Sequence, residues 1–154
     1  MTPPEEGRFE LGTDGPKAIL VGVDGSTTST RAAWYAAGLA RRQGARVVAV
    51  YVGPLASAAV AAGGAAMAAA EAEMFDETAG ELRRRAAEVA HELSIPIDFV
   101  ATRGDPFSEL RRVADDMRAD AMVVGASTKA GHRLVGSLAV RLVRAGRWPV
   151  TVVP

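Results

Sequence analysis

The residues best suited to chemistry in this chain of 154 residues lie in a loop near its C-terminal end. Residues 123–137 are VVGASTKAGHRLVGS: an apolar run stops at Gly125, small and polar residues including Ser127 follow, and Gly136 and Ser137 open a helical pattern. Small residues leave backbone N–H groups accessible, and a helix N-terminus attracts negative charge. The loop therefore predicts a phosphate-binding site.

The elements that must position this loop alternate between strands and helices along the chain. Apolar runs typical of buried strands lie at residues 18–23, 46–52, 95–101, 121–124 and 149–153, and a helical pattern fills each of the four intervals. This alternation predicts an α/β fold, a doubly wound, Rossmann-like parallel sheet of five strands with helices on both faces. Ligands of such sheets lie at the carboxyl ends of strands, and Asp24 and Gly125 each follow one. Pro96, early in the third run, favours an edge position for that strand.

Residues 1–16 contain several prolines and glycines and are predicted to be a flexible leader to a single domain of residues 17–154. Within the domain, segment 55–73 is unusually rich in alanine, and helix is expected to start near Ala65, after two glycines. We interpret this segment as a lid or a partner-docking helix.

Helical spacing also predicts which faces of the helices are buried. On the first helix, the predicted buried stripe is Thr30, Ala33, Trp34, Ala37 and Ala40, with Ser26 or Thr27 as the cap. Trp148, before the last strand, is interpreted as a packing or dimer-contact residue.

Composition excludes several classes of function. Eighteen basic residues balance eighteen acidic ones, so nothing draws the chain to nucleic acid or to an anionic membrane surface. There are no cysteines, and neither a membrane-spanning run nor a secretory signal is present, which makes the cytoplasm the expected location. Dinucleotide, P-loop and nucleophile-elbow motifs are all missing, and no metal centre or catalytic triad can be assembled. We therefore expect a protein that is not an enzyme.

Four segments, in this order and spacing, resemble the universal stress protein family. They are ILVGVDGS at residues 19–26, ADAMVVG at 119–125, the Gly-Ser pair at 136–137 and WPVTVVP at 148–154. The resemblance covers residues 17–154 and implies the strand order 3-2-1-4-5, which makes Asp24 and Gly125 neighbours. It also implies a homodimer formed through the final strand.

The resemblance further implies binding of ATP by a stress-response protein without catalytic activity. The aspartate after strand one lies near adenine and ribose in nucleotide-binding members, a residue late in strand two contacts the base, and the loop after strand four surrounds the phosphates. Carried over to this chain, the nucleotide-binding residues are Asp24, Val50, Val124, Gly125, Ser127, Gly136, Ser137 and Leu138.

The loop departs from the family pattern Gly-x2-Gly-x9-Gly-Ser/Thr. Thr128 stands at the second glycine position, and seven residues rather than nine separate it from Gly136. Two fewer residues shorten the reach of the loop by up to roughly 7 Å. A second hypothesis follows, in which the chain is an interaction module that has lost ATP binding.

Each candidate residue also has a purely structural interpretation. Asp24 is either a ribose ligand or the residue of an Asx-turn that starts the first helix, and Gly125 either admits phosphate or only turns the chain. Gly136 and Ser137 bind phosphate or form a helix cap. Lys129, His132 and Arg133 supply charge to phosphates or form a solvated loop.

Overall fold

The computed structural model describes residues 15–55, 62–127 and 136–154, and its centre is a five-stranded parallel sheet. The strands are β1 (Ala18–Gly22), β2 (Arg46–Gly53), β3 (Ile97–Arg103), β4 (Ala121–Gly125) and β5 (Val150–Val153). Their order is β3-β2-β1-β4-β5, which confirms the predicted order and the predicted edge position of the third strand. The central strand β1 pairs with β4 in a register that places Val21 beside Val123, so both strands end at the same edge of the sheet.

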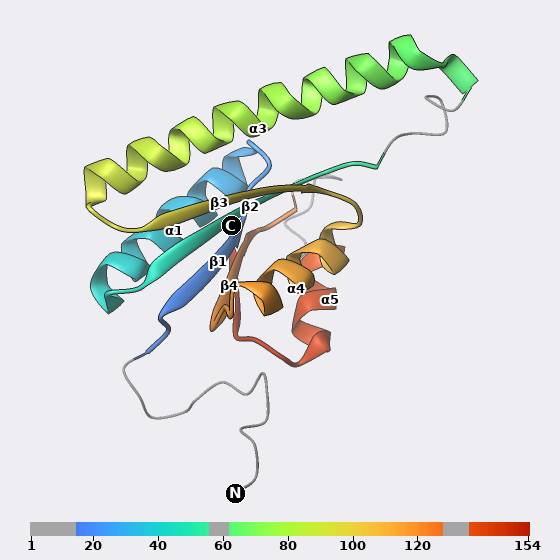
Figure 1. Cartoon of the computed structure of the whole chain (residues 1–154). Helices are drawn as coiled ribbons and strands as arrows, with labels where there is room; N and C mark the ends of the chain where they lie inside the picture. Colours follow the sequence, from blue (N-terminus) through green and yellow to red (C-terminus); the bar gives the residue numbers. More distant parts are fainter. Residues whose placement is uncertain (1–14, 56–61, 128–135) are drawn as a thin grey trace, which may run out of the picture.

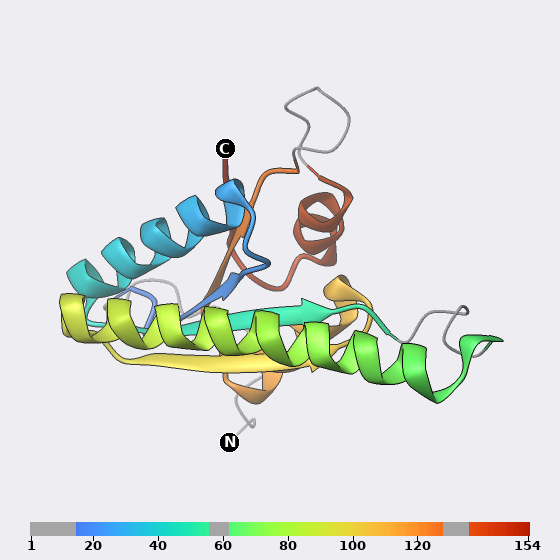
Figure 2. The same cartoon turned by 90° about the horizontal axis from the view of Figure 1, so that it is seen from above.

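Helices cover both faces of this sheet (Figures 1 and 2). They are α1 (Thr27–Gln43), α3 (Ala65–Leu93), α4 (Pro106–Asp116) and α5 (Ser137–Ala145). Side chains of successive strand residues alternate between the two faces, so Ile19 and Val21 pack with α1, whereas Leu20 packs with α4 and α5. The strands thus contribute to two hydrophobic cores, as expected of a doubly wound fold.

The start of the domain is tied to the strand that carries the candidate loop. Asp120, just before β4, accepts the N–H groups of Lys17 and Ala18 through Oδ2 at 2.8 and 2.9 Å. These bonds fix the beginning of β1 against β4. Most of the predicted leader, residues 1–14, lies outside the described residues.

Helix α1 begins and ends as its sequence predicts, and Ala37 and Ala40 of its predicted stripe are buried, but Trp34 is not. Ser26 is its N-cap, and Gly44 ends it in the left-handed conformation at φ 64°. The predicted burial of Trp34 is wrong, because its side chain is 48% exposed while Ala32 and Ala36 are fully buried. Alanines let the helix lie close to the sheet, and an indole on the same face would hold it away.

Helix α3 starts at Ala65, as predicted, and continues for 29 residues. At about 1.5 Å per residue it is roughly 43 Å long, and its N-terminal end extends past the end of the sheet in Figure 2. Only Ala79 of this helix is buried. No helix in the described segments has both the length and the apolar character needed to cross a membrane.

Candidate functional site

The turn between β1 and α1 places Asp24 at the carboxyl end of the central strand. The Ser26 N–H donates to Asp24 Oδ1 at 2.9 Å, and the Asp24 N–H donates to Ser29 Oγ at 3.2 Å. Gly25 has a φ of +82°, a conformation that glycine adopts without a steric penalty. Ser26 then caps α1 by accepting the Ser29 N–H at 3.2 Å. Asp24 is thus the residue of an Asx-turn that starts the helix.

The carboxyl group of Asp24 remains ionised to an unusually low pH. Partial burial acts to raise the pKa of Asp24, but hydrogen bonds from Ser26 and Ser29 lower it by more, so the pKa lies below its ordinary value. Because the pKa is depressed in the folded chain, the carboxylate stabilises the fold above the pKa of the unfolded chain. This contribution is lost as the pH falls through the folded value.

We expect Asp24→Ala to lower the free energy of unfolding by about 1 kcal/mol at pH 7, because the Ser26 N–H loses its acceptor. The deficit should shrink as the pH falls from about 4, the ordinary pKa of an aspartate, through the lower pKa of the folded chain, where the wild-type carboxylate becomes protonated. Urea unfolding at pH 7 and pH 3 measures both effects. Asp76→Ala, at an exposed position on α3, is the control. Equal deficits of Asp24→Ala at the two pH values would contradict a role for the charge.

Gly125 ends β4 directly against the first turn of α1. A Cβ atom at this position would lie 2.6 Å from the carbonyl carbon of Thr28 and 2.7 Å from the backbone nitrogen of Ser29. Backbone atoms cannot rotate away from such a contact, so the closeness of helix and strand requires a glycine here. Ser29 therefore lies between Asp24 and Gly125, and the structure brings these two predicted site residues together at the ends of neighbouring strands.

The two ends of the candidate phosphate loop meet each other. A Cβ atom on Gly136 would lie 2.8 Å from the Cβ of Ser127, so the loop leaves and returns through one narrow place. Gly136 is the N-cap of α5 and provides no side chain to its N–H groups, and Ser137 is exposed at the first helical position. The remainder of the loop, residues 128–135, lies outside the described residues, and with it Thr128, Lys129, His132 and Arg133.

Three other predicted site residues belong to the core under α4 and α5. Val50 and Val124 are 1% and 3% exposed, and Leu138 packs against the same cluster from α5. The Val50 carbonyl accepts the Val23 N–H at 2.9 Å, which joins the ends of β2 and β1. The structure thus places Val50 one strand away from Asp24, with its side chain turned to the interior.

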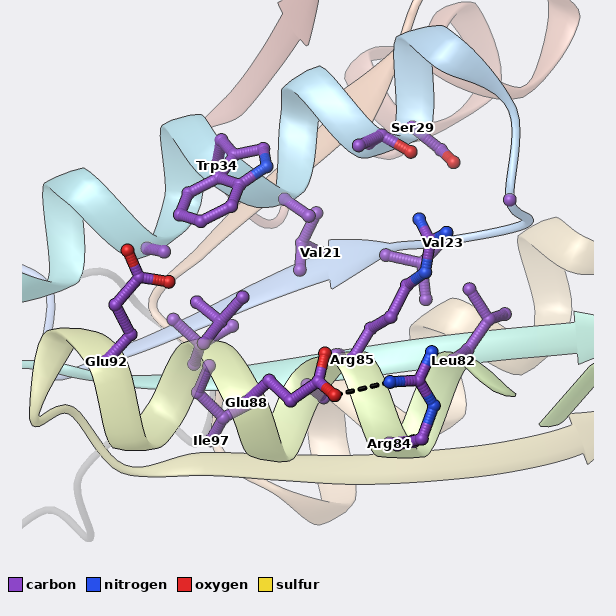
Figure 3. A pocket seen from close by; sticks show the side chains of 18 residues that line it. Val21, Val23, Ser29, Trp34, Leu82, Arg84, Arg85, Glu88, Glu92 and Ile97 are labelled. Carbon is purple, nitrogen blue, oxygen red and sulfur yellow. Dashed lines mark hydrogen bonds and ion pairs between the residues drawn. The ribbon is translucent and has the colours of Figure 1, made fainter. Parts of the chain in front are cut away.

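The sequence did not indicate a cavity that lies between α1 and α3 (Figure 3). Trp34, assigned to the core from helical spacing, lines this cavity together with Leu82 and Val89 of α3. The size of Trp34 is the signal that could have revealed this cavity. An indole does not fit between the sheet and a helix that packs on it through alanines. Among the described residues, no group of three or more His, Cys, Asp or Glu side chains could hold a metal ion.

Comparisons with known proteins agree with this architecture. The model of the universal stress protein family matches residues 16–154. The universal stress protein MJ0531 of Methanocaldococcus jannaschii is 30% identical over 139 residues, which cover 89% of this chain and 81% of that protein.

Solved structures extend the likeness to three dimensions. UspA of Lactobacillus plantarum is 25% identical, with a TM-score of 0.72 over 96% of this chain and 99% of that one. A universal stress protein solved in complex with cAMP is 26% identical, with a TM-score of 0.67 over 90% of this chain and 97% of that one. The sheet order, the glycine at the end of β4 and these matches lead to one conclusion: the chain belongs to the universal stress protein family.

Proposed function

We propose that this protein binds an adenine nucleotide, ATP, where β1 and β4 end, and acts as a stress-response protein in the cytoplasm without catalysing a reaction. The observation that carries the proposal is the junction of Gly136 with Ser127. It holds the two ends of the loop together beside the N-terminus of α5, whose cap residue offers no side chain. Free N–H groups at a helix N-terminus suit a phosphate.

The position of Asp24 supports the other half of this site. Its carboxylate is ionised at the end of the strand next to β4, and Oδ1 accepts the Ser26 N–H. A carboxylate has about four acceptor positions, so it can accept a ribose hydroxyl as well. A relative solved in complex with cAMP gives this assignment a precedent within the family.

The shortened loop favours a second function, an interaction module that no longer binds ATP. Native mass spectrometry of the purified protein separates the two functions. Our proposal predicts a species heavier than the 16.0 kDa chain by the mass of an adenine nucleotide per chain, released on denaturation. Bare protein, unchanged after incubation with millimolar ATP, would instead favour the interaction module.

We also propose that the protein dimerises through the outer edge of β5. This strand pairs with β4 on one side and is the last strand in the sheet order. The carbonyls of Pro149 and Val153 accept N–H groups from the β4 side. By the two-residue period of a strand, the N–H and C=O groups of Val152 then point to the open edge, where a second copy could pair.

Val152→Pro is expected to convert the dimer to a monomer, because it removes an outward N–H while sparing the bonds to β4. Val152→Thr keeps both the N–H and the branched shape, and should leave the dimer intact. Light scattering coupled to gel filtration gives the mass, with twice 16.0 kDa expected for the wild type and the threonine variant. A wild-type chain that is monomeric at micromolar concentration would contradict the proposed interface.

A further inference from the structure

A cavity of about 370 Å³ separates α1 from α3 on one face of the sheet (Figure 3). Its floor includes Val21, Val47 and Ile97 from three neighbouring strands, and Trp34 and Leu82 stand on its two walls. Pockets of about 300–1,000 Å³ with apolar linings hold small molecules. A second helix, about 10–12 Å across with its side chains, is too large for this space.

Charge at the rim of this cavity comes from α3. Arg84 is paired on both sides, with Glu81 and with Glu88. Arg85 donates its Nε–H to Glu81 Oε1 at 3.0 Å, and that oxygen also accepts from Arg84. Within the part of the chain that the structure describes, the two terminal nitrogens of Arg85 make no hydrogen bond.

The side chain of Arg85 extends from α3 across the cavity mouth toward Val23, at the end of β1 (Figure 3). Its guanidinium therefore presents two terminal nitrogens beside an apolar space. A planar pair of N–H donors matches the two oxygens of a carboxylate or the oxygens of a sulfonate. The Arg85 end of this mouth thus complements an anion attached to an apolar body, whereas Glu92 lines the cavity at its opposite end (Figure 3).

We propose that the cavity between α1 and α3 is a binding site for a small apolar molecule with one anionic group. The apolar body lies against Trp34 and the strand floor, and the anion pairs with the terminal nitrogens of Arg85. This site goes beyond the proposed function. The cavity reaches Gly25 and Ser29 of the β1–α1 turn, but it lies on the face of the sheet that α1 and α3 cover, whereas the phosphate loop leads into α5 on the other face.

Two related dyes test the proposal: 8-anilinonaphthalene-1-sulfonate, which is anionic, and N-phenyl-1-naphthylamine, which is not. Both should bind the folded protein saturably and accept energy from Trp34. Trp34→Phe should remove most of this energy transfer, and Trp148→Phe should preserve most of it. Ala86→Phe, which fills the cavity from α3, should weaken both dyes more than about tenfold.

The charge is tested by Arg85→Gln. It should weaken the sulfonate dye about fivefold, as expected of a partly exposed ion pair, and change the uncharged dye by less than about twofold. Arg42→Gln, at an exposed arginine outside the cavity, should change neither dye. Circular dichroism confirms that each variant is folded.

Three results would overturn the proposal. They are no saturable binding of the sulfonate dye to the wild type at millimolar concentration, equal effects of Arg85→Gln on both dyes, and displacement of the dye by ATP. The last result would assign the cavity to the nucleotide. Gly136→Glu should leave dye binding unchanged, so the cavity and the nucleotide site can fail independently.

Discussion

Gly125→Ala is expected to lower the midpoint of thermal unfolding by roughly 6–12 °C, the largest effect on stability that we predict for an added methyl group. The new Cβ would lie 2.6–2.8 Å from the backbone of Thr28 and Ser29. Real Cβ atoms do not approach other atoms so closely, so the first turn of α1 must move away from β4. Overpacking of this kind costs about 3 kcal/mol, which corresponds to a few degrees for each kcal/mol in a chain of this size.

Gly38→Ala is the matched control for this substitution. Gly38 lies within α1, and a Cβ there would meet no atom within 4 Å. Alanine in a helix interior is favoured over glycine by about 0.5–1 kcal/mol, so this variant should be slightly more stable than the wild type. Calorimetry of the two variants measures both changes. A Gly125→Ala protein as stable as the wild type would show that α1 can withdraw from the strand without penalty.

Gly136→Glu is expected to weaken ATP binding at least about 100-fold while leaving the fold intact. Its Cβ would lie 2.8 Å from the Cβ of Ser127 and would force apart the two ends of the loop. The added carboxylate also brings negative charge to the N-terminus of α5, where the proposed phosphates lie. Two like charges about 4 Å apart repel by about 4 kcal/mol near a protein surface, enough for a loss of this size.

Two controls separate the causes of that loss. Gly80→Glu adds the same carboxylate on α3, where a Cβ meets no atom within 4 Å, and should leave ATP binding unchanged. Gly136→Ala adds the steric contact without the charge and should have an intermediate effect. Titration calorimetry gives the affinities, and circular dichroism shows that each variant is folded. Equal affinities of Gly136→Glu and the wild type would place the phosphates elsewhere.

The arrangement of the sheet could be predicted from the sequence because each strand has an apolar run of its own. The proline before β3 indicated that this strand lies at an edge of the sheet. The glycines that end α1 and β4 indicated where the chain turns. The partners of each strand came from the family resemblance, since apolar runs alone do not determine which strands are neighbours.

The predictions that failed or had two interpretations depend on how closely a helix packs against the sheet. Helical spacing selected Trp34 for the core because it treats all apolar side chains alike, whereas packing selected alanines that let α1 approach the sheet. Gly125 had two interpretations in the sequence, and only the closeness of Thr28 and Ser29 provides the steric reason for a glycine. Residues 128–135, where the loop is two residues short, lie outside the described residues.

Titration of the purified, nucleotide-free protein with ATP in a calorimeter tests the central claim most directly. We predict saturable heat with one ATP per chain and a Kd below about 1 mM, together with a rise in the unfolding midpoint at saturating ATP. No heat and no shift of the midpoint at millimolar ATP, with the protein folded throughout, would contradict nucleotide binding at the ends of β1 and β4.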